Sequence, residues 1–101
     1  MKENDYVLVR TYSAGVHVGE LVSKTTNQAG YFEVVLKNAR RIYCWSGAAT
    51  LSQLATEGTS NPKDCKFPCE VSEIHLSQGI EIIPVTAKAR ESISGVRIWA
   101  M

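Results

Sequence analysis

The stretch that decides the fold class is RRIYCWSGAATLSQLATEG, residues Arg40 to Gly58, because a strand pattern passes into a helix pattern within it. The first six residues, RRIYCW, continue a series of strands that precedes them. Ser46 is a good helix N-cap, and Gly58 is a good C′ residue. The apolar residues between them recur at helical spacing, at Ala48, Leu51, Leu54 and Ala55. The stretch therefore predicts a strand, a Ser-Gly turn and a short helix.

Three more strands are predicted before this stretch, at YVLVRTY (6–12), VHVGELVSK (16–24) and YFEVVLKN (31–38). The turn Ser13–Gly15 joins the first two, and a turn at Asn38 and Ala39 leads into RRIYCW. Gly19 predicts a bulge or a close approach by another backbone or a ligand. Short connections favour an antiparallel meander. Alternation in the first strand places Val7, Val9 and Thr11 toward the core and Tyr6, Leu8, Arg10 and Tyr12 on the other face.

After the helix, CKFPCEVSEIHL (65–76) predicts a loop and then a strand, whereas GIEIIPV (79–85) fits either a strand or a turn. Thr86 caps a second helix, AKARESIS, which ends at Gly95. The apolar tail VRIWAM needs cover in the core or against a neighbouring subunit. The predicted fold is a single α+β domain, residues 1–101, with an antiparallel β-meander sheet and two short helices, and it is expected to be oligomeric.

Composition and charge exclude several classes of protein. The chain has 101 residues, 45% hydrophobic and 21% charged, with a formal net charge of +1, so no general attraction to duplex nucleic acid is expected. No apolar run approaches the ~20 residues of a membrane span, and the first ten residues lack a signal-peptide pattern. The three cysteines are expected to be reduced, and the Cys65-x-x-x-Cys69 spacing is not a standard zinc spacing. A cytosolic protein without metal, cofactor or membrane partner is predicted.

The first candidate ligand site is the end of the predicted fourth strand. Alternation places Arg41, Tyr43 and Trp45 on one face and Arg40 on the other. The strand ends at the predicted helix N-terminus, Ser46–Gly47, where free N–H groups favour an anion. An arginine beside aromatic rings can pair with a phosphate while a base stacks. The alternative is ordinary packing of the rings over the helix, with Arg41 as a solvated edge residue.

The second candidate is the hairpin turn, whose backbone can form a flexible lip over a ligand or can be a turn and no more. Its residues are Tyr12, Ser13, Ala14, Gly15 and His17.

Phe67 is either packed in the core or offered to a ligand, and Arg90 is either solvated or a ligand residue. The sequence contains no nucleophile elbow, H-E-x-x-H motif or P-loop, so no catalytic residue is predicted. An active site assembled from scattered residues stays open.

Over most of its length the chain resembles a family of small phage and prophage proteins. The most specific segments are S-A-G-V-H-x-G, N-A-R-R-I-x-x-W-S-G-A-A and I-E-I-I-P. The family is further identified with the phage anti-Thoeris sponges of the first-described type. The resemblance implies a homo-oligomer built from dimers, up to a hexamer, in the cytoplasm of the infected bacterial host.

The same resemblance implies that the protein sequesters the cyclic ADP-ribose isomers of Thoeris immunity without degrading them. Some members also hold cyclic oligonucleotides of CBASS immunity at a separate site between subunits. The family's ligand residues are an aromatic and several arginines, and the positions here that match are Arg10, Arg40 or Arg41, Phe67 and Arg90. Two other functions stay open: a phosphodiesterase-type enzyme that cleaves such signals, and a protein-binding inhibitor or structural phage protein that uses the patch Ile98, Trp99 and Met101.

Overall fold

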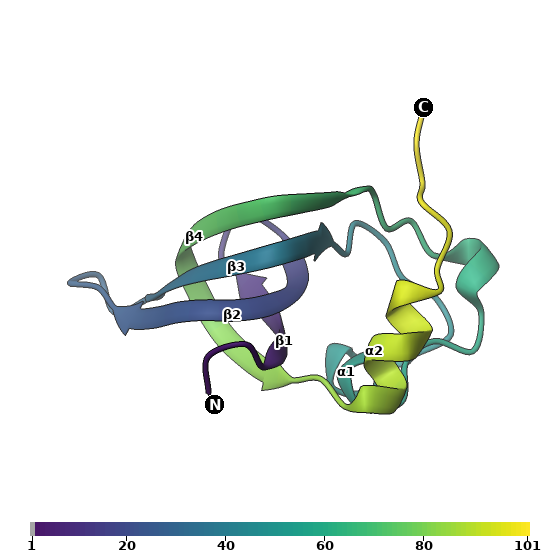
Figure 1. The fold of residues 1–101 in the computed structure, drawn as a ribbon, viewed down its shortest axis with the longest axis horizontal. Coiled ribbons are helices and arrows are strands. Elements are labelled where there is room, and N and C mark those ends of the chain that lie inside the picture. The colour runs from purple at the N-terminus through teal and green to yellow at the C-terminus, as the bar shows by residue number, and fades with distance from the viewer. Residues whose placement is uncertain (1) are drawn as a thin grey trace.

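The computed structural model describes residues 2–101, and four antiparallel strands form a closed barrel at its centre (Figure 1). The strands are β1 (Tyr6–Thr11), β2 (Val16–Thr26), β3 (Phe32–Arg41) and β4 (Glu70–Pro84). Each strand pairs with the next, which confirms the predicted antiparallel meander. The chain also pairs β4 with β1, and this closure was not predicted.

β4 closes the barrel because it pairs with two neighbours in turn. Its first part, from Glu70 to Gly79, pairs with β3, and its second part, from Gly79 to Pro84, pairs with β1. Register shifts interrupt both pairings, and such bulges bend a strand. The two segments distinguished in the sequence are therefore one long bent strand. Closure gives β1 and β3 a paired strand on each side, so neither of them is an edge strand.

The predicted turn at Asn38 and Ala39 is wrong, because β3 continues through both residues. Asn38 has a φ of 50°, which marks an irregularity inside the strand. Opposite it, Gly19 approaches β3 so closely that an added Cβ would lie 3.1 Å from the Cα of Ala39. The register between β2 and β3 shifts at this point, so the bulge and close approach predicted at Gly19 are confirmed.

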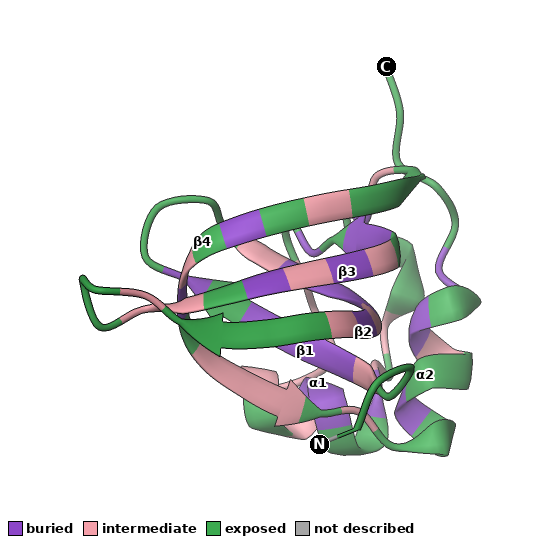
Figure 2. Ribbon diagram, turned by 60° about the vertical axis from the view of Figure 1, so that its left-hand side comes forward, coloured by how far each residue is buried: buried purple, intermediate pink, exposed green. Residues whose placement is uncertain are grey.

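Buried residues lie on the barrel strands and on both helices (Figure 2), and their apolar side chains form two groups. The barrel core consists of Val7, Val9, Leu21, Val34, Leu36, Ala39 and Leu76. The second group packs between the barrel and the helices and consists of Leu8, Val18, Ile42, Leu54, Ala55, Cys65, Phe67, Ile93 and Val96. β1 contributes to both groups. The predicted alternation is confirmed, since Val7 and Val9 belong to the barrel core and Leu8 lies on the other face, which the helices cover.

Two helices, α1 (Leu51–Glu57) and α2 (Ala87–Ser94), lie on the same side of the barrel in Figure 1, with the short 3₁₀ helix η1 (Pro62–Asp64) beside them. The predicted caps of α2 and the end of α1 at Gly58 are confirmed. The predicted start of α1 at Ser46 is wrong. Thr50 is the N-cap, since its side chain accepts a hydrogen bond from the Gln53 N–H at 3.1 Å.

Residues 46–49 form a loop instead of the first helical turn. Gly47 has a φ of 80°, which is outside the helical region. The Gly47 carbonyl accepts hydrogen bonds from the Ser60 N–H at 3.2 Å and from the Ser60 hydroxyl at 3.1 Å. This loop is therefore tied to residues 59–61 and cannot continue α1 backwards. Among residues 2–101 no helix has the length and apolarity to cross a bilayer.

Candidate functional site

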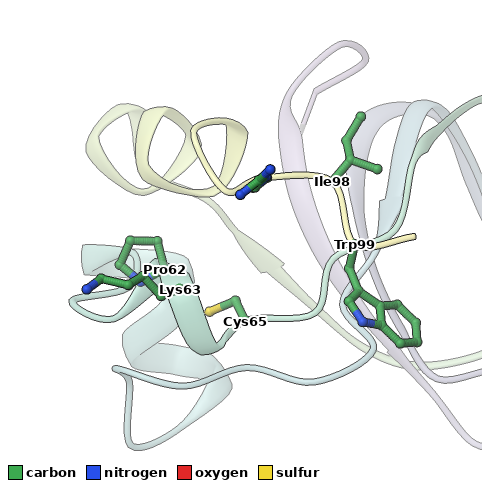
Figure 3. A pocket seen from close by; sticks show the side chains of 6 residues that line it. Pro62, Lys63, Cys65, Ile98 and Trp99 are labelled. Carbon is green, nitrogen blue, oxygen red and sulfur yellow. The ribbon is translucent and has the colours of Figure 1, made fainter. Parts of the chain in front are cut away.

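A pocket of about 410 Å³ lies between η1 and the C-terminal tail (Figure 3). Its walls are Pro62, Lys63 and Cys65 on one side and Arg97, Ile98 and Trp99 on the other. The volume falls within the range of pockets that bind small molecules. The chain therefore offers a site where two segments far apart in the sequence meet.

Backbone hydrogen bonds hold three short segments together beside this pocket. The Trp99 N–H donates to the Phe67 carbonyl at 3.0 Å, and Ile98 forms an isolated bridge with Phe67. Lys66 in turn pairs with Cys44, through bonds of 2.7 and 3.3 Å. Residues 43–44, 66–67 and 98–99 thus lie side by side. This arrangement brings Trp99 against Tyr43.

Tyr43 and Trp99 form a stacked aromatic pair at this site. Their ring centroids are 5.2 Å apart, and the rings are inclined by only 5°. Both side chains reach solvent, with 62% of Tyr43 and 39% of Trp99 exposed. Aromatic side chains of this kind are platforms on which nucleobases stack.

Three cations lie in the pocket wall or beside Trp99. Lys63 and Arg97 line the pocket, and the Lys66 Nζ lies 5.6 Å from the centroid of the Trp99 ring. Within residues 2–101 none of the three has a carboxylate at ion-pair distance, and no acidic residue lines the pocket. The site therefore combines unpaired positive charge with exposed π surface, and it is suited to an anion that carries an aromatic ring.

The residues predicted at the hairpin turn form a separate group at one end of the barrel. The Ala14 carbonyl accepts hydrogen bonds from the Arg41 Nη1 at 2.6 Å and from the His17 Nε2 at 2.9 Å. Gly15 lies against the same guanidinium, and the Ser13 hydroxyl donates to the Gln78 side chain. The structure thus joins the predicted hairpin residues to Arg41. The turn is tied down by these bonds, so the expectation of a flexible lip is not supported.

His17 is a buried residue of this group, with 1% of its surface exposed. Burial lowers the pKa of His17, because the protein interior disfavours the charged imidazolium. The hydrogen bond to Ala14 opposes this shift in pKa, and the positive charge of Arg41 adds to it. His17 and Arg41 both line a small pocket of about 170 Å³ with Ala39, Pro68, Cys69, Val71 and Ile74.

Arg40 and Phe67 lie in the core. Arg40 is 6% exposed and Phe67 is fully buried, and the guanidinium carbon lies 5.5 Å from the centre of the Phe67 ring. Arg40 lines a small pocket of about 150 Å³ with Tyr6, Glu70, Ser94, Val96 and Ile98, separate from the Tyr43–Trp99 pair, whereas Phe67 is enclosed in the core. Of the two alternatives for Phe67, the structure therefore gives the core position. The predicted separation of Arg40 from Arg41 is confirmed, since one is buried and the other is exposed.

The predicted common face of Arg41, Tyr43 and Trp45 is wrong, because the chain leaves β3 after Arg41. Trp45 packs against the core beneath the helices, and its Nε1 donates to the Ala48 carbonyl at 3.2 Å. The predicted anion site at Ser46–Gly47 is also wrong, because α1 begins five residues later than Ser46, at Leu51. The Ser46 N–H instead donates to the Cys65 sulfur at 3.4 Å.

The remaining predicted residues lie apart from the tail pocket. Arg10 pairs with Glu81 at 2.8 Å, and Tyr12 lies 6.1 Å from Tyr31, centroid to centroid. The Arg90 Nη2 lies 3.6 Å from the Glu20 carboxylate, and its guanidinium lies 4.4 Å above the centre of the Tyr6 ring. Arg90 is therefore an exposed charge, which agrees with the solvated alternative, and it also pairs with Glu20.

Sequence reasoning missed as ligand candidates three residues that line the tail pocket, Lys63, Arg97 and Trp99, and Lys66, which lies over the Trp99 ring. A weak signal was present, because Arg97 stands two residues before Trp99 and Lys66 stands next to Phe67. The decisive information was the pairing of residues 98–99 with residue 67, which depends on the tertiary fold. All three thiols are free, and residues 2–101 hold no group of three or more His, Cys, Asp or Glu suited to a metal.

A protein family described as a domain of unknown function (DUF6948) matches residues 4–93 of the chain. No curated protein and no solved structure matches it. The matched range contains the whole barrel, α1 and almost all of α2, and it stops before the tail residues that line the pocket.

Proposed function

The chain belongs to the DUF6948 family, a domain of unknown function, and we propose that it is a phage anti-defence protein that sequesters a cyclic nucleotide immune signal. The ligands proposed are cyclic ADP-ribose isomers and, in second place, the cyclic oligonucleotides of CBASS immunity. The resemblance of its sequence to the anti-Thoeris sponges supports this ligand class. The proposed setting is the cytoplasm of the infected bacterium.

The observation that carries the proposal is the stacked pair of Tyr43 and Trp99 beside three unpaired cations. A nucleotide presents a ring that stacks and phosphates that need positive charge. A base can extend the stack at Tyr43, while Lys63, Lys66 and Arg97 lie within the same site for the phosphates. The net charge of +1 does not attract polyanions in general, so this local arrangement favours a small ligand.

The lining of the pocket supports binding over cleavage. Among the described residues that line it, none is a histidine or a carboxylate. His17 lies inside the barrel end, and His75 pairs with Glu73 at 2.8 Å on the outer surface. The lining thiol, Cys65, is engaged by the Ser46 backbone at 3.4 Å. A general base positioned for hydrolysis is therefore not among the lining side chains.

A homo-oligomer is part of the proposal. Ile98, Trp99 and Met101 are exposed apolar side chains next to the pocket, and a second subunit placed there would enclose more of the ligand. Sequestration works by mass action. The free signal falls only when the protein is abundant and its Kd lies below the concentration of the signal.

Titration calorimetry with cyclic ADP-ribose isomers and cyclic di- and trinucleotides tests the proposal. We expect binding to the wild type and recovery of intact ligand after denaturation. Tyr43→Ala should weaken binding by roughly tenfold or more, since stacking contributes about 1–3 kcal/mol per base. Tyr12→Ala is the matched control, because Tyr12 is an equally exposed tyrosine whose ring neighbour is Tyr31.

Three results would contradict the proposal. No heat with any of these nucleotides at protein concentrations well above micromolar excludes the ligand class. Recovery of a product in place of the ligand identifies an enzyme. A wild type that binds no nucleotide but loses a co-purifying host protein on Trp99→Ala identifies a protein-binding function.

A further inference from the structure

Arg40 holds a charged group in the core without a carboxylate beside it. The side chain is 6% exposed, and no acidic group of residues 2–101 lies within ion-pair distance of its guanidinium. A buried charge is costly unless hydrogen bonds or an opposite charge compensate for it. Backbone carbonyls accept all of its hydrogen bonds, and the Glu70 carboxylate acts on the charge from beyond ion-pair distance. The identity of those carbonyls indicates what the residue does.

Four hydrogen bonds connect the guanidinium to two segments of the chain. On the loop before β4, Nε donates to the Pro68 carbonyl at 2.9 Å, and Nη2 donates to the Phe67 carbonyl at 2.9 Å. At the end of α2, Nη1 donates to the Ile93 carbonyl at 2.9 Å, and Nη2 donates to the Val96 carbonyl at 2.8 Å. Arg40 itself belongs to β3, so one side chain joins the barrel, the loop and the helix end.

Both segments continue directly into the walls of the tail pocket. Residues Cys65 and Lys66 precede Phe67, and residues Arg97 to Trp99 follow Val96. The Phe67 carbonyl is the common acceptor, because it receives the Arg40 Nη2 at 2.9 Å and the Trp99 N–H at 3.0 Å. The position of the Trp99 backbone, and with it the ring that stacks on Tyr43, therefore depends on a group that Arg40 holds.

Only arginine suits this arrangement. Its planar guanidinium carries five N–H donors in a rigid fork, and four directions are used here. A lysine ammonium has three donors on a flexible stem and is more strongly hydrated, so it would leave carbonyls unpaired. The C-terminal end of α2 is also the negative end of the helix dipole, which favours a positive charge.

We propose that Arg40 is the positioning residue of the Tyr43–Trp99 site: it touches no ligand, and it fixes the loop and the tail that form the pocket. The expected effect of Arg40 on ligand binding rests on the proposed function. The claim that Arg40 holds the loop and the tail in place does not. The family resemblance implies that Arg40 or Arg41 contacts the ligand. The hydrogen bonds of Arg40 support instead a role in holding the residues that form the pocket.

Hydrogen exchange measured by NMR on the ligand-free protein tests the structural part. In Arg40→Lys the Trp99 amide should exchange at least tenfold faster than in the wild type, while amides of β1 and β2 keep their rates. Arg41→Lys is the matched control, since Arg41 is the next residue along β3 and bonds only to Ala14. In this control the Trp99 amide should be unchanged.

If Arg40→Lys fails to fold, the wild type alone decides the matter. If Arg40 holds the tail, a single local unfolding event exposes both the Arg40 Nη protons and the Trp99 amide to solvent. The two should then show equal protection against hydrogen exchange. A Trp99 amide that exchanges freely while the Arg40 protons are protected overturns the proposal, as does unchanged Trp99 exchange in a folded Arg40→Lys.

Calorimetry with cyclic ADP-ribose and cyclic di-AMP tests the consequence for binding. Arg40→Lys should bind at least tenfold more weakly than Arg41→Lys. Suppose that the Trp99 amide exchanges faster in Arg40→Lys but that Arg40→Lys and Arg41→Lys bind the ligand with equal affinity. This result would refute the positioning role and leave the proposed function intact. Absence of binding to the wild type would refute the proposed function, and the exchange data would still decide whether Arg40 holds Trp99.

Discussion

His17 is a buried imidazole at the barrel end, close to the Arg41 guanidinium and without an acidic partner among the groups that act on it. Its folded-state pKa is lowered by burial, with Arg41 acting in the same direction. The unfolded chain has the ordinary pKa of about 6.5. Below that pH the unfolded state takes up a proton that the folded state resists, so acid favours unfolding.

We therefore expect the free energy of unfolding to be independent of His17 above pH 6.5 and to fall as the pH drops below it toward the folded pKa. The slope from this one group is at most about 1.4 kcal/mol per pH unit. Urea unfolding between pH 8 and pH 5 measures it. His17→Gln should flatten the profile, whatever its effect on absolute stability.

A profile that stays equally steep in His17→Gln would show that other groups cause the acid sensitivity. Stability that increases as the pH falls through this window would show that the pKa shift has the opposite sign.

The two adjacent arginines show how far single residues can be interpreted from the sequence. Strand alternation was sufficient to place Arg40 and Arg41 on opposite sides. It could not say which of them is buried, because in this barrel the helices cover one outer face and both sides of β1 and β3 contain buried residues. The carbonyl partners of Arg40 lie 27 to 56 residues further along the chain, so no local pattern indicates them.

At the level of elements, helix ends were predicted where a side chain or a glycine conformation fixes them. Thr86 is such a position through its side chain, and Gly58 through its φ of 81°. Gly95 ends α2 in the ordinary helical region, with its N–H bonded to the Glu91 and Ile93 carbonyls. The start of α1 was misplaced because Ser46 and Thr50 are both suitable caps by residue type. The choice between them depends on Gly47 and its contacts with residues 59–61, which are tertiary.

The cap of α1 gives a prediction about stability. Thr50→Ala removes the oxygen that accepts the Gln53 N–H, so it should lower the free energy of unfolding by about 1 kcal/mol. Thr50→Ser keeps that oxygen and should retain most of the stability. Chemical denaturation of the three proteins makes the comparison. Equal stability of the alanine and serine variants would show that the cap contributes nothing here.

At the level of the whole molecule, the antiparallel order of the strands followed from their short connections, but the closure of the barrel did not. Closure depends on β4, which changes its partner from β3 to β1 at Gly79. The pairing of β1 with β4, at opposite ends of the chain, has no periodic pattern in the sequence that would reveal it. The tail pocket was missed for the same reason. Its two walls come from residues 62–65 and 97–99, which no short-range pattern connects.

The charge distribution of the whole molecule leads to a final prediction about salt. The net charge is +1, yet Lys63 and Arg97 line the tail pocket and Lys66 lies over the Trp99 ring. Among residues 2–101, no acidic group lies within ion-pair distance of these three. Beyond a Debye length, about 8 Å at physiological salt, the protein is nearly neutral, whereas a phosphate in the site is within reach of all three charges. The affinity for cyclic ADP-ribose should therefore fall several-fold between 50 and 300 mM NaCl, with no measurable binding of duplex DNA at either concentration.

Lys66→Gln should reduce this salt dependence, because it removes the cation that lies over the Trp99 ring. Lys88→Gln, which removes a lysine of α2 outside the tail pocket, should leave it unchanged. Calorimetry at four salt concentrations compares the three proteins. Identical salt dependence in all of them would place the ligand phosphates away from the tail pocket, since a charge in contact with a phosphate must contribute to the response of affinity to ionic strength.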